Sequence, residues 1–135
     1  YCSPGFNLPV GSLGRSRGYM YPEHHTSLDN REFISFEEMR RSVDICFDIM
    51  STLEANSTYL NLMPYGEPQL GKRGLYPTLG TPGRSEEISA ILWLLNLSDG
   101  EHDLLSVAEQ SGHDINVLSE LAHSCIKAGL LKRIA

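Results

Sequence analysis

The chain has 135 residues, of which 41% are hydrophobic, and a formal net charge of -6 at pH 7. This composition is typical of a globular protein and excludes a disordered chain. No secretory signal and no apolar run long enough to cross a bilayer is present, so we expect no membrane partner. The expected cytoplasmic location rests on the cysteine pattern.

The chain begins with Tyr1 and not with Met, so we expect it to start inside a longer protein. Its cysteines are Cys2, Cys46 and Cys125, an odd number without a CxxC pair. This pattern favours reduced thiols over a disulfide framework or a structural zinc knot. Cys46 and Cys125 fall within helical patterns, and we predict that both lie in a core.

The first 18 residues are rich in glycine and proline, and residues 8–13 are interpreted as a short strand. The loop that follows carries Arg15 and Arg17. A guanidinium group can bind a carboxylate through two hydrogen bonds, so these arginines are candidate substrate-binding residues. The alternative is a pair of exposed loop arginines.

Residues 21–29 hold His24 and His25 side by side, with Glu23 before them and Asp29 after them. Imidazole is the commonest protein ligand of zinc. A carboxylate often accepts a hydrogen bond from the second ring nitrogen and so fixes the orientation of the ring. The segment is therefore a candidate edge of a metal site, the alternative being a solvated turn. Neighbouring side chains of extended backbone point in opposite directions, so at most one of the two histidines would bind a metal.

A strong helix is predicted to begin after Ser35, because Ser35 and Glu38 have the spacing of a capping box. Its apolar residues recur every three or four positions: Phe36, Met39, Val43, Phe47, Met50 and Leu53. The helix should end near Asn56. Such a face needs a sheet or other helices to cover it, so we expect it to be exposed in this chain and covered by an upstream part of the parent protein.

Residues 59–84 lack periodicity and are rich in glycine and proline, so they are interpreted as a long ordered loop. We expect residues 59–78 to pack on the preceding domain and residues 79–84 to form a linker. Lys72 and Arg73 could meet an anion, or could simply occupy a glycine-stabilised turn.

The remaining residues, 85–135, predict a small helical module. Ser85, Asp103 and Asp114 are candidate N-caps of three helices, the second near residues 104–111 and the third near 115–128. Residues 130–134 alternate as a strand. This order of elements is that of a winged helix-turn-helix.

The charge of this module argues against nucleic-acid binding. Residues 85–135 carry eight acidic and three basic residues, a net charge of -5. The would-be recognition helix holds one base, Lys127, near its far end. Phosphate contacts by Lys and Arg supply most affinity for nucleic acid. We therefore expect that the chain does not bind nucleic acid. We expect instead that residues 85–135 bind a protein partner or mediate self-association.

Three stretches carry a family resemblance: residues 1–13, the Tyr-Pro-Glu-His-His-Thr-Ser run at 21–27, and residues 61–78 with Tyr-Gly-Glu-Pro-Gln-Leu-Gly-Lys-Arg-Gly-Leu-Tyr-Pro-Thr at 65–78. The chain resembles the C-terminal part of bacterial aminopeptidase-like proteins found with polysaccharide biosynthesis genes. The resemblance implies an α/β fold class for residues 1–78, as a fragment of a zinc-exopeptidase-like three-layer domain. A linker at 79–84 and a winged helix at 85–135 would follow, in a chain that is mainly helical.

The resemblance also implies a site. The family's last metal-binding histidine falls on His25, although His24 stands where the family has Tyr, which leaves open which imidazole binds the metal. Asp29 or Glu23 would hold that ring, while the other ligands and the catalytic carboxylate lie upstream. The implied cofactor is zinc and the implied substrate a small peptide-like molecule, with the chain inactive alone. The alternative is a non-catalytic scaffold protein of a polysaccharide pathway, whose winged helix contacts a protein.

Overall fold

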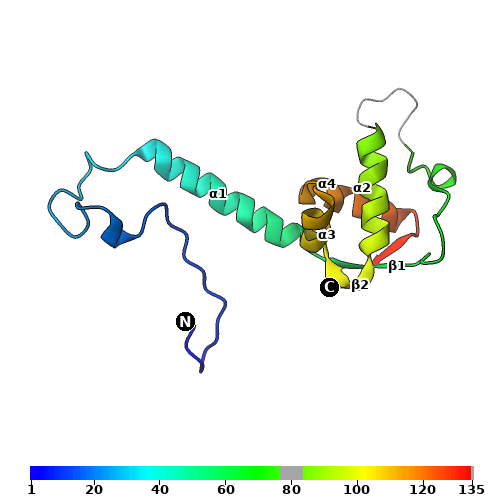
Figure 1. Ribbon diagram of the computed structural model, residues 1–135, viewed down its shortest axis with the longest axis horizontal. Helices are drawn as coiled ribbons and strands as arrows, with labels where there is room; N and C mark the ends of the chain where they lie inside the picture. The colour runs from blue at the N-terminus through cyan, green and yellow to red at the C-terminus, as the bar shows by residue number, and fades with distance from the viewer. Residues whose placement is uncertain (77–83, 135) are drawn as a thin grey trace. The chain divides into compact units, whose positions relative to one another are not determined.

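The computed structural model describes residues 1–76 and 84–134 (Figure 1). The chain divides into two compact units, Tyr1–Ser42 and Val43–Ala135. The helices are α1 (Phe36–Ala55), α2 (Arg84–Leu97), α3 (Leu104–Ser111) and α4 (Ile115–Lys127), with short 3-10 turns at Gly18–Met20 (η1) and Leu70–Arg73 (η2). The strands are β1 (Thr58–Asn61), β2 (Asp99–Asp103) and β3 (Leu131–Arg133). The described chain is thus mainly helical, as predicted.

The unit Tyr1–Ser42 consists largely of turns. Residues 8–13 form no strand, so that prediction is wrong. The backbone there bonds locally, with Leu8 N donating to Tyr1 O at 3.1 Å and Val10 N to Leu8 O at 2.8 Å. A strand needs a neighbouring strand to satisfy its backbone groups, and within the described residues none lies beside this segment.

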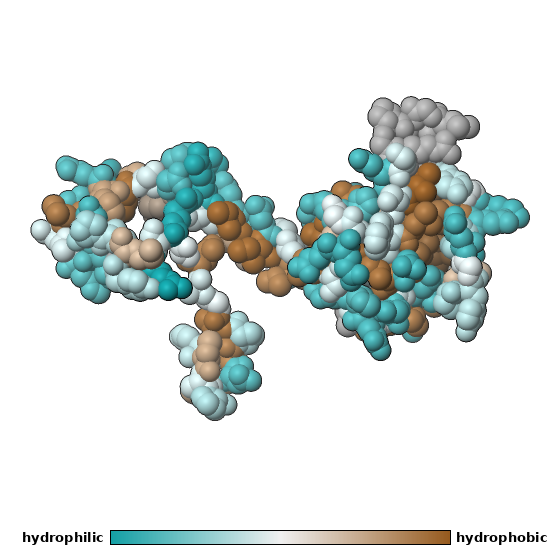
Figure 2. Space-filling view, viewed as in Figure 1, coloured by the Kyte–Doolittle hydropathy of each residue, from teal (hydrophilic) through white to brown (hydrophobic). Residues whose placement is uncertain are grey.

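Helix α1 begins where the capping box predicts. The Glu38 backbone N–H donates to Ser35 Oγ at 3.3 Å, and Arg41 pairs with Glu38 at 2.8 Å one turn later. None of its residues is buried. Its apolar face is exposed as expected, from 50% at Met50 to 67% at Leu53 (Figure 2). Cys46 is exposed as well, so its predicted core position is wrong in this chain.

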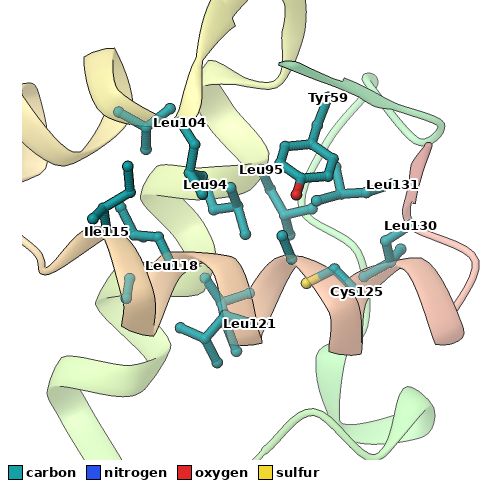
Figure 3. Packing of buried hydrophobic residues seen from close by; sticks show 14 of the residues in the cluster. Tyr59, Leu94, Leu95, Leu104, Ile115, Leu118, Leu121, Cys125, Leu130 and Leu131 are labelled. Carbon is teal, nitrogen blue, oxygen red and sulfur yellow. The ribbon is translucent and has the colours of Figure 1, made fainter. Parts of the chain in front are cut away.

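The second unit contains a three-stranded antiparallel sheet in the order β2-β1-β3, so β1 is the central strand. Thr58 lies opposite Asp103 on β2, and Tyr59 lies opposite Arg133 on β3. Side chains from α2, α3, α4 and the sheet converge on one core (Figure 3). The most deeply buried large residues are Leu70, Ile91, Leu94, Leu104, Val107, Leu118, Cys125 and Leu130.

The winged-helix core reaches further toward the N-terminus than the predicted start at Ser85. Tyr59 and Leu70 are only 4% and 1% exposed and belong to this core. These two residues of the segment that was expected to pack on a preceding domain therefore pack in the winged-helix core. The predicted linker, 79–84, lies outside the described residues except for Arg84, where α2 begins.

Arg73 shows what the turn at Leu70–Arg73 contributes. Its guanidinium donates to Ala128 O at 2.8 Å, at the C-terminal end of α4. A cation at this end satisfies a free carbonyl and complements the helix dipole. Arg73 thus fixes the loop to the core, and this contact replaces the anion contact that the sequence left open.

The Asp103 carboxylate joins three elements. It accepts hydrogen bonds from Ser106 N at 2.9 Å, which caps α3, and from Asn56 Nδ2 at 2.9 Å, just after α1. The Asn56 side chain also accepts from Leu105 N at 2.9 Å. The bonds from Asn56 and Ser106 lower the pKa of Asp103. One carboxylate therefore ties the end of α1 and the start of α3 to the sheet.

Replacing this carboxylate should destabilise the module. We expect Asp103→Ala to lower the free energy of unfolding by about 1–2 kcal/mol, because it removes a helix cap and leaves the Asn56 amide without its acceptor. Urea unfolding followed by circular dichroism measures the change. Glu101→Ala, an exposed position on the same strand, is the matched control and should change little. Equal losses in the two variants would contradict the central role of Asp103.

The three thiols should differ sharply in reactivity. Burial raises the pKa of Cys125 to about 11, and its side chain is fully inaccessible, whereas Cys2 and Cys46 are exposed. Because the thiolate is the reactive form, we expect two thiols of the native chain to react with Ellman's reagent at pH 8 and the third only after unfolding in urea. Rapid reaction of all three in the native chain would contradict the packing around Cys125.

Candidate functional site

The histidine segment folds as a series of tight turns. His24 N donates to Tyr21 O at 3.4 Å, and Thr26 N donates to Glu23 O at 3.1 Å. The Thr26 hydroxyl donates to the same Glu23 carbonyl at 2.8 Å. His25 sits in the left-handed region with φ 61, a conformation that costs about 1–2 kcal/mol for a residue with a Cβ atom. The turn is held by its own backbone and by the Thr26 hydroxyl.

The two imidazoles lie on the same side of this turn. Their ring centroids are 3.8 Å apart and the rings are nearly parallel, at 24°. The expectation that the two side chains point in opposite directions is therefore wrong, because the backbone is a left-handed turn and not an extended strand. His24 is partly buried against Tyr21, whose hydroxyl lies 3.4 Å from Nδ1, whereas His25 is exposed. His25 is thus the more accessible of the two rings.

The carboxylates expected to hold the ring do not do so here. Across residues 1–76 and 84–134, neither Glu23 nor Asp29 forms a side-chain hydrogen bond with an imidazole, and no group of three or more His, Cys, Asp or Glu side chains converges as a metal site. A zinc site needs three or four ligands. The described residues supply at most one or two, so any metal site would need ligands from elsewhere.

The candidate substrate-binding arginines line one hollow with Ser12, Gly14, Ser16 and Met20. Arg15 is already paired: it forms an ion pair with Glu38 and donates to Glu38 O at 3.1 Å and to Ser42 Oγ at 3.2 Å. Arg17 donates to Tyr19 Oη at 2.8 Å. Arg15 therefore attaches the N-terminal segment to α1, and of the two guanidiniums Arg17 has fewer protein partners.

The second candidate surface is helix α4, which occupies the place of a recognition helix. Asp114 caps it by accepting from Asn116 N at 2.8 Å, as predicted. Its exposed residues include Val117, Glu120 and His123, and its one base, Lys127, is at its last turn. A recognition helix without Lys or Arg near its N-terminal end can make few contacts with the phosphates of nucleic acid.

Strand β2 carries a charged turn with a strongly acidic carboxyl group. Asp99 Oδ1 accepts from Glu101 N at 2.8 Å and from His102 N at 3.0 Å, and Oδ2 lies 2.8 Å from His102 Nδ1. The backbone bonds from His102 and Glu101 are the main cause that lowers the pKa of Asp99 to about 2. This end of the module therefore keeps a negative charge down to low pH.

No helix among residues 1–76 and 84–134 has both the length and the apolar character needed to cross a bilayer.

The fold defines a winged-helix protein extended at its N-terminus by a long helix and a turn-rich segment that carries two stacked histidines. Residues 57–133 match the winged helix-turn-helix family, and the chain belongs to that family. Residues 1–56 match a domain of unknown function. The start of the winged-helix match at residue 57 agrees with the packing of Tyr59 and Leu70 in the core.

Two relatives come from Clostridium acetobutylicum. One is provisionally named a polysaccharide biosynthesis protein with an aminopeptidase-like domain, and it is 41% identical over 99% of this chain and 31% of its own length. The other is a crystal structure provisionally described as a peptidase, with 39% identity and a TM-score of 0.80 over 98% of this chain and 28% of that one. The chain thus spans less than a third of either relative.

The hydrogen bonds to the Asp99 carboxylate should be detectable as a lowered pKa of this group. We expect a pKa of about 2 by NMR, against the ordinary 3.8. Because the folded pKa is the lower one, the stabilisation is complete above the unfolded value and is lost as the pH falls through the folded one. Asp99→Asn should therefore flatten the acid side of a urea stability profile, whereas Glu101→Gln should not. An Asp99 pKa near 3.8 would contradict the geometry of this turn.

Proposed function

We propose that this chain is the C-terminal part of a zinc-dependent aminopeptidase-like hydrolase that acts on a small peptide-like substrate. The observation that carries the proposal is the His24–His25 turn, in which His25 is exposed and held in left-handed backbone. Strained positions of this kind concentrate at functional sites. The two relatives, one named for an aminopeptidase-like domain and the other described as a peptidase, support the same reading.

In this proposal His25 acts as a metal ligand and His24 as the ring that packs behind it. Zinc would supply a water of lowered pKa and a Lewis acid for the scissile carbonyl. The imidazole chemistry of His25 fits zinc, but one such ligand does not hold the ion. Glu23 or Asp29 would support the ring only after a side-chain rearrangement. The other ligands would come from the rest of the parent protein, so the 135-residue chain should be inactive alone.

The chemistry of the winged helix supports a contact with protein, either a partner or a second copy, and not with nucleic acid or membrane. Its net charge is -5 over residues 85–135, and α4 offers one base. A reducing compartment such as the cytoplasm suits the three free cysteines.

A scaffold role in a polysaccharide pathway is the second candidate. It is favoured by the name of the relative, which refers to polysaccharide biosynthesis. In that case the parent would keep the shape of a peptidase without its chemistry, and the histidine turn would be a surface turn.

Zinc analysis of the full-length parent tests the proposal. We expect about two zinc ions per chain, as in paired-metal hydrolases, and the loss of one or both in His25→Ala. His24→Ala should keep more zinc than His25→Ala. His123→Ala, which removes an exposed histidine on α4, is the matched control and should keep the full metal content.

Two outcomes would contradict the metal site. A parent that binds no zinc, with His25→Ala unchanged in stability, would favour the scaffold role. A parent that binds zinc equally well in all three variants would place the metal away from the histidine turn. In either case peptide hydrolysis should also be indifferent to His25.

A further inference from the structure

A groove of about 800 Å³ runs along α2, between this helix and the loop that follows β1. Apolar side chains gather beside α2 in this unit (Figure 2). The groove's main lining residues are Ile88, Leu92 and Trp93 from α2 and Pro64, Glu67 and Pro68 from the loop.

Helix α2 has more apolar surface than the core uses. Ile91 and Leu94 are buried in the core, whereas Leu92 and Trp93 are still 37% and 38% exposed. A surface helix normally has a polar outer face, so apolar residues beyond the core face call for a second contact. Tryptophan in particular is enriched among the residues that dominate binding at protein interfaces. The floor of the groove therefore suits apolar side chains of a partner.

The charge of the groove has a single sign. Its charged lining residues are Glu67 and Asp99, both carboxylates, and no basic side chain is among the described residues that line it. Asp99 remains ionised, because its hydrogen bonds hold its pKa at about 2. The module around the groove carries a net charge of -5 over residues 85–135. A complementary partner is therefore apolar where it meets the floor and basic where it meets the rim.

We propose that this groove binds a peptide segment of a partner protein in which apolar side chains are flanked by Lys or Arg. The apolar side chains pack on Leu92 and Trp93, and the basic ones meet Glu67 and Asp99. The inference rests on the protein-contact role proposed above for the winged helix. It depends on neither His25 nor zinc, so the metal analysis and the peptide experiment can fail independently.

Peptide selection tests the proposal. A phage-displayed random dodecapeptide library is selected on the immobilised 135-residue chain, and the enriched peptides are synthesised. Trp93 is the single tryptophan, so its emission reports binding in the groove. We expect the enriched peptides to combine Leu, Phe or Ile with Lys or Arg and to shift the emission to shorter wavelength. Raising the salt concentration should weaken binding severalfold, because the rim charges are exposed.

Two variants and two matched controls locate the binding site. Leu92→Asp should raise Kd at least about tenfold, because it places a charge on the apolar floor. Glu67→Lys should raise it about threefold, as expected for a contact at the rim. Val117→Asp on α4 and Glu109→Lys on α3 change exposed residues outside the groove and should leave Kd unchanged. Circular dichroism confirms that each variant is folded.

Several results would overturn the proposal. The proposal is wrong if the selection yields no peptide, or only peptides that are acidic or uncharged. Equal weakening by Val117→Asp would move the site to α4. A dimer seen by light scattering and abolished by Leu92→Asp would assign the groove to a second copy of the chain. Peptides that bind the 135-residue chain but not the full-length parent would show that the parent covers the groove itself.

Discussion

The arrangement of the second unit depends on the hydrogen bonds that the Asp103 carboxylate accepts. Its backbone belongs to β2, opposite Thr58 of β1, while its side chain caps α3 and accepts from Asn56. Only two residues separate the end of α1 from the start of β1. Asn56 side-chain atoms donate to Asp103 and accept from Leu105 N. The residue that directly follows α1 is therefore hydrogen-bonded to the winged helix.

The helices were predictable because their signals are local. The caps Ser35, Asp103 and Asp114 act as the sequence indicates, and α3 has the predicted bounds. Ser85 lies inside α2, which begins at Arg84, so its predicted role as an N-cap is wrong. Strand β1 was not predictable in this way. It has four residues, too few to show alternation, and its partners lie some 40 and 70 residues further along the chain. Strand β1 is recognised by its hydrogen bonds to β2 and β3 and not by its amino-acid composition. For the same reason the winged helix was predicted to begin at Ser85, although Tyr59 and Leu70 complete its core.

The candidate site was predictable in residue type but not in geometry. The sequence indicates a histidine turn, and the structure adds the left-handed backbone at His25 and the ring stacking with His24. Arg15 was proposed as a substrate ligand because its chemistry suits a carboxylate; the carboxylate that it meets is Glu38 of the same chain. The groove beside α2 was missed, although Leu92 and Trp93 widen the apolar face of that helix beyond one side.

The central position of β1 has a consequence for the synthesis of the chain. Tyr59 pairs with Arg133, so the strand leaves the ribosome long before its second partner exists. At about 5–20 residues per second, the delay is roughly 4–15 s. During this time an edge that carries Tyr59 and Leu60 is open to strands of other molecules. The nascent winged helix therefore keeps one edge of β1 open to misassembly until its last strand is made.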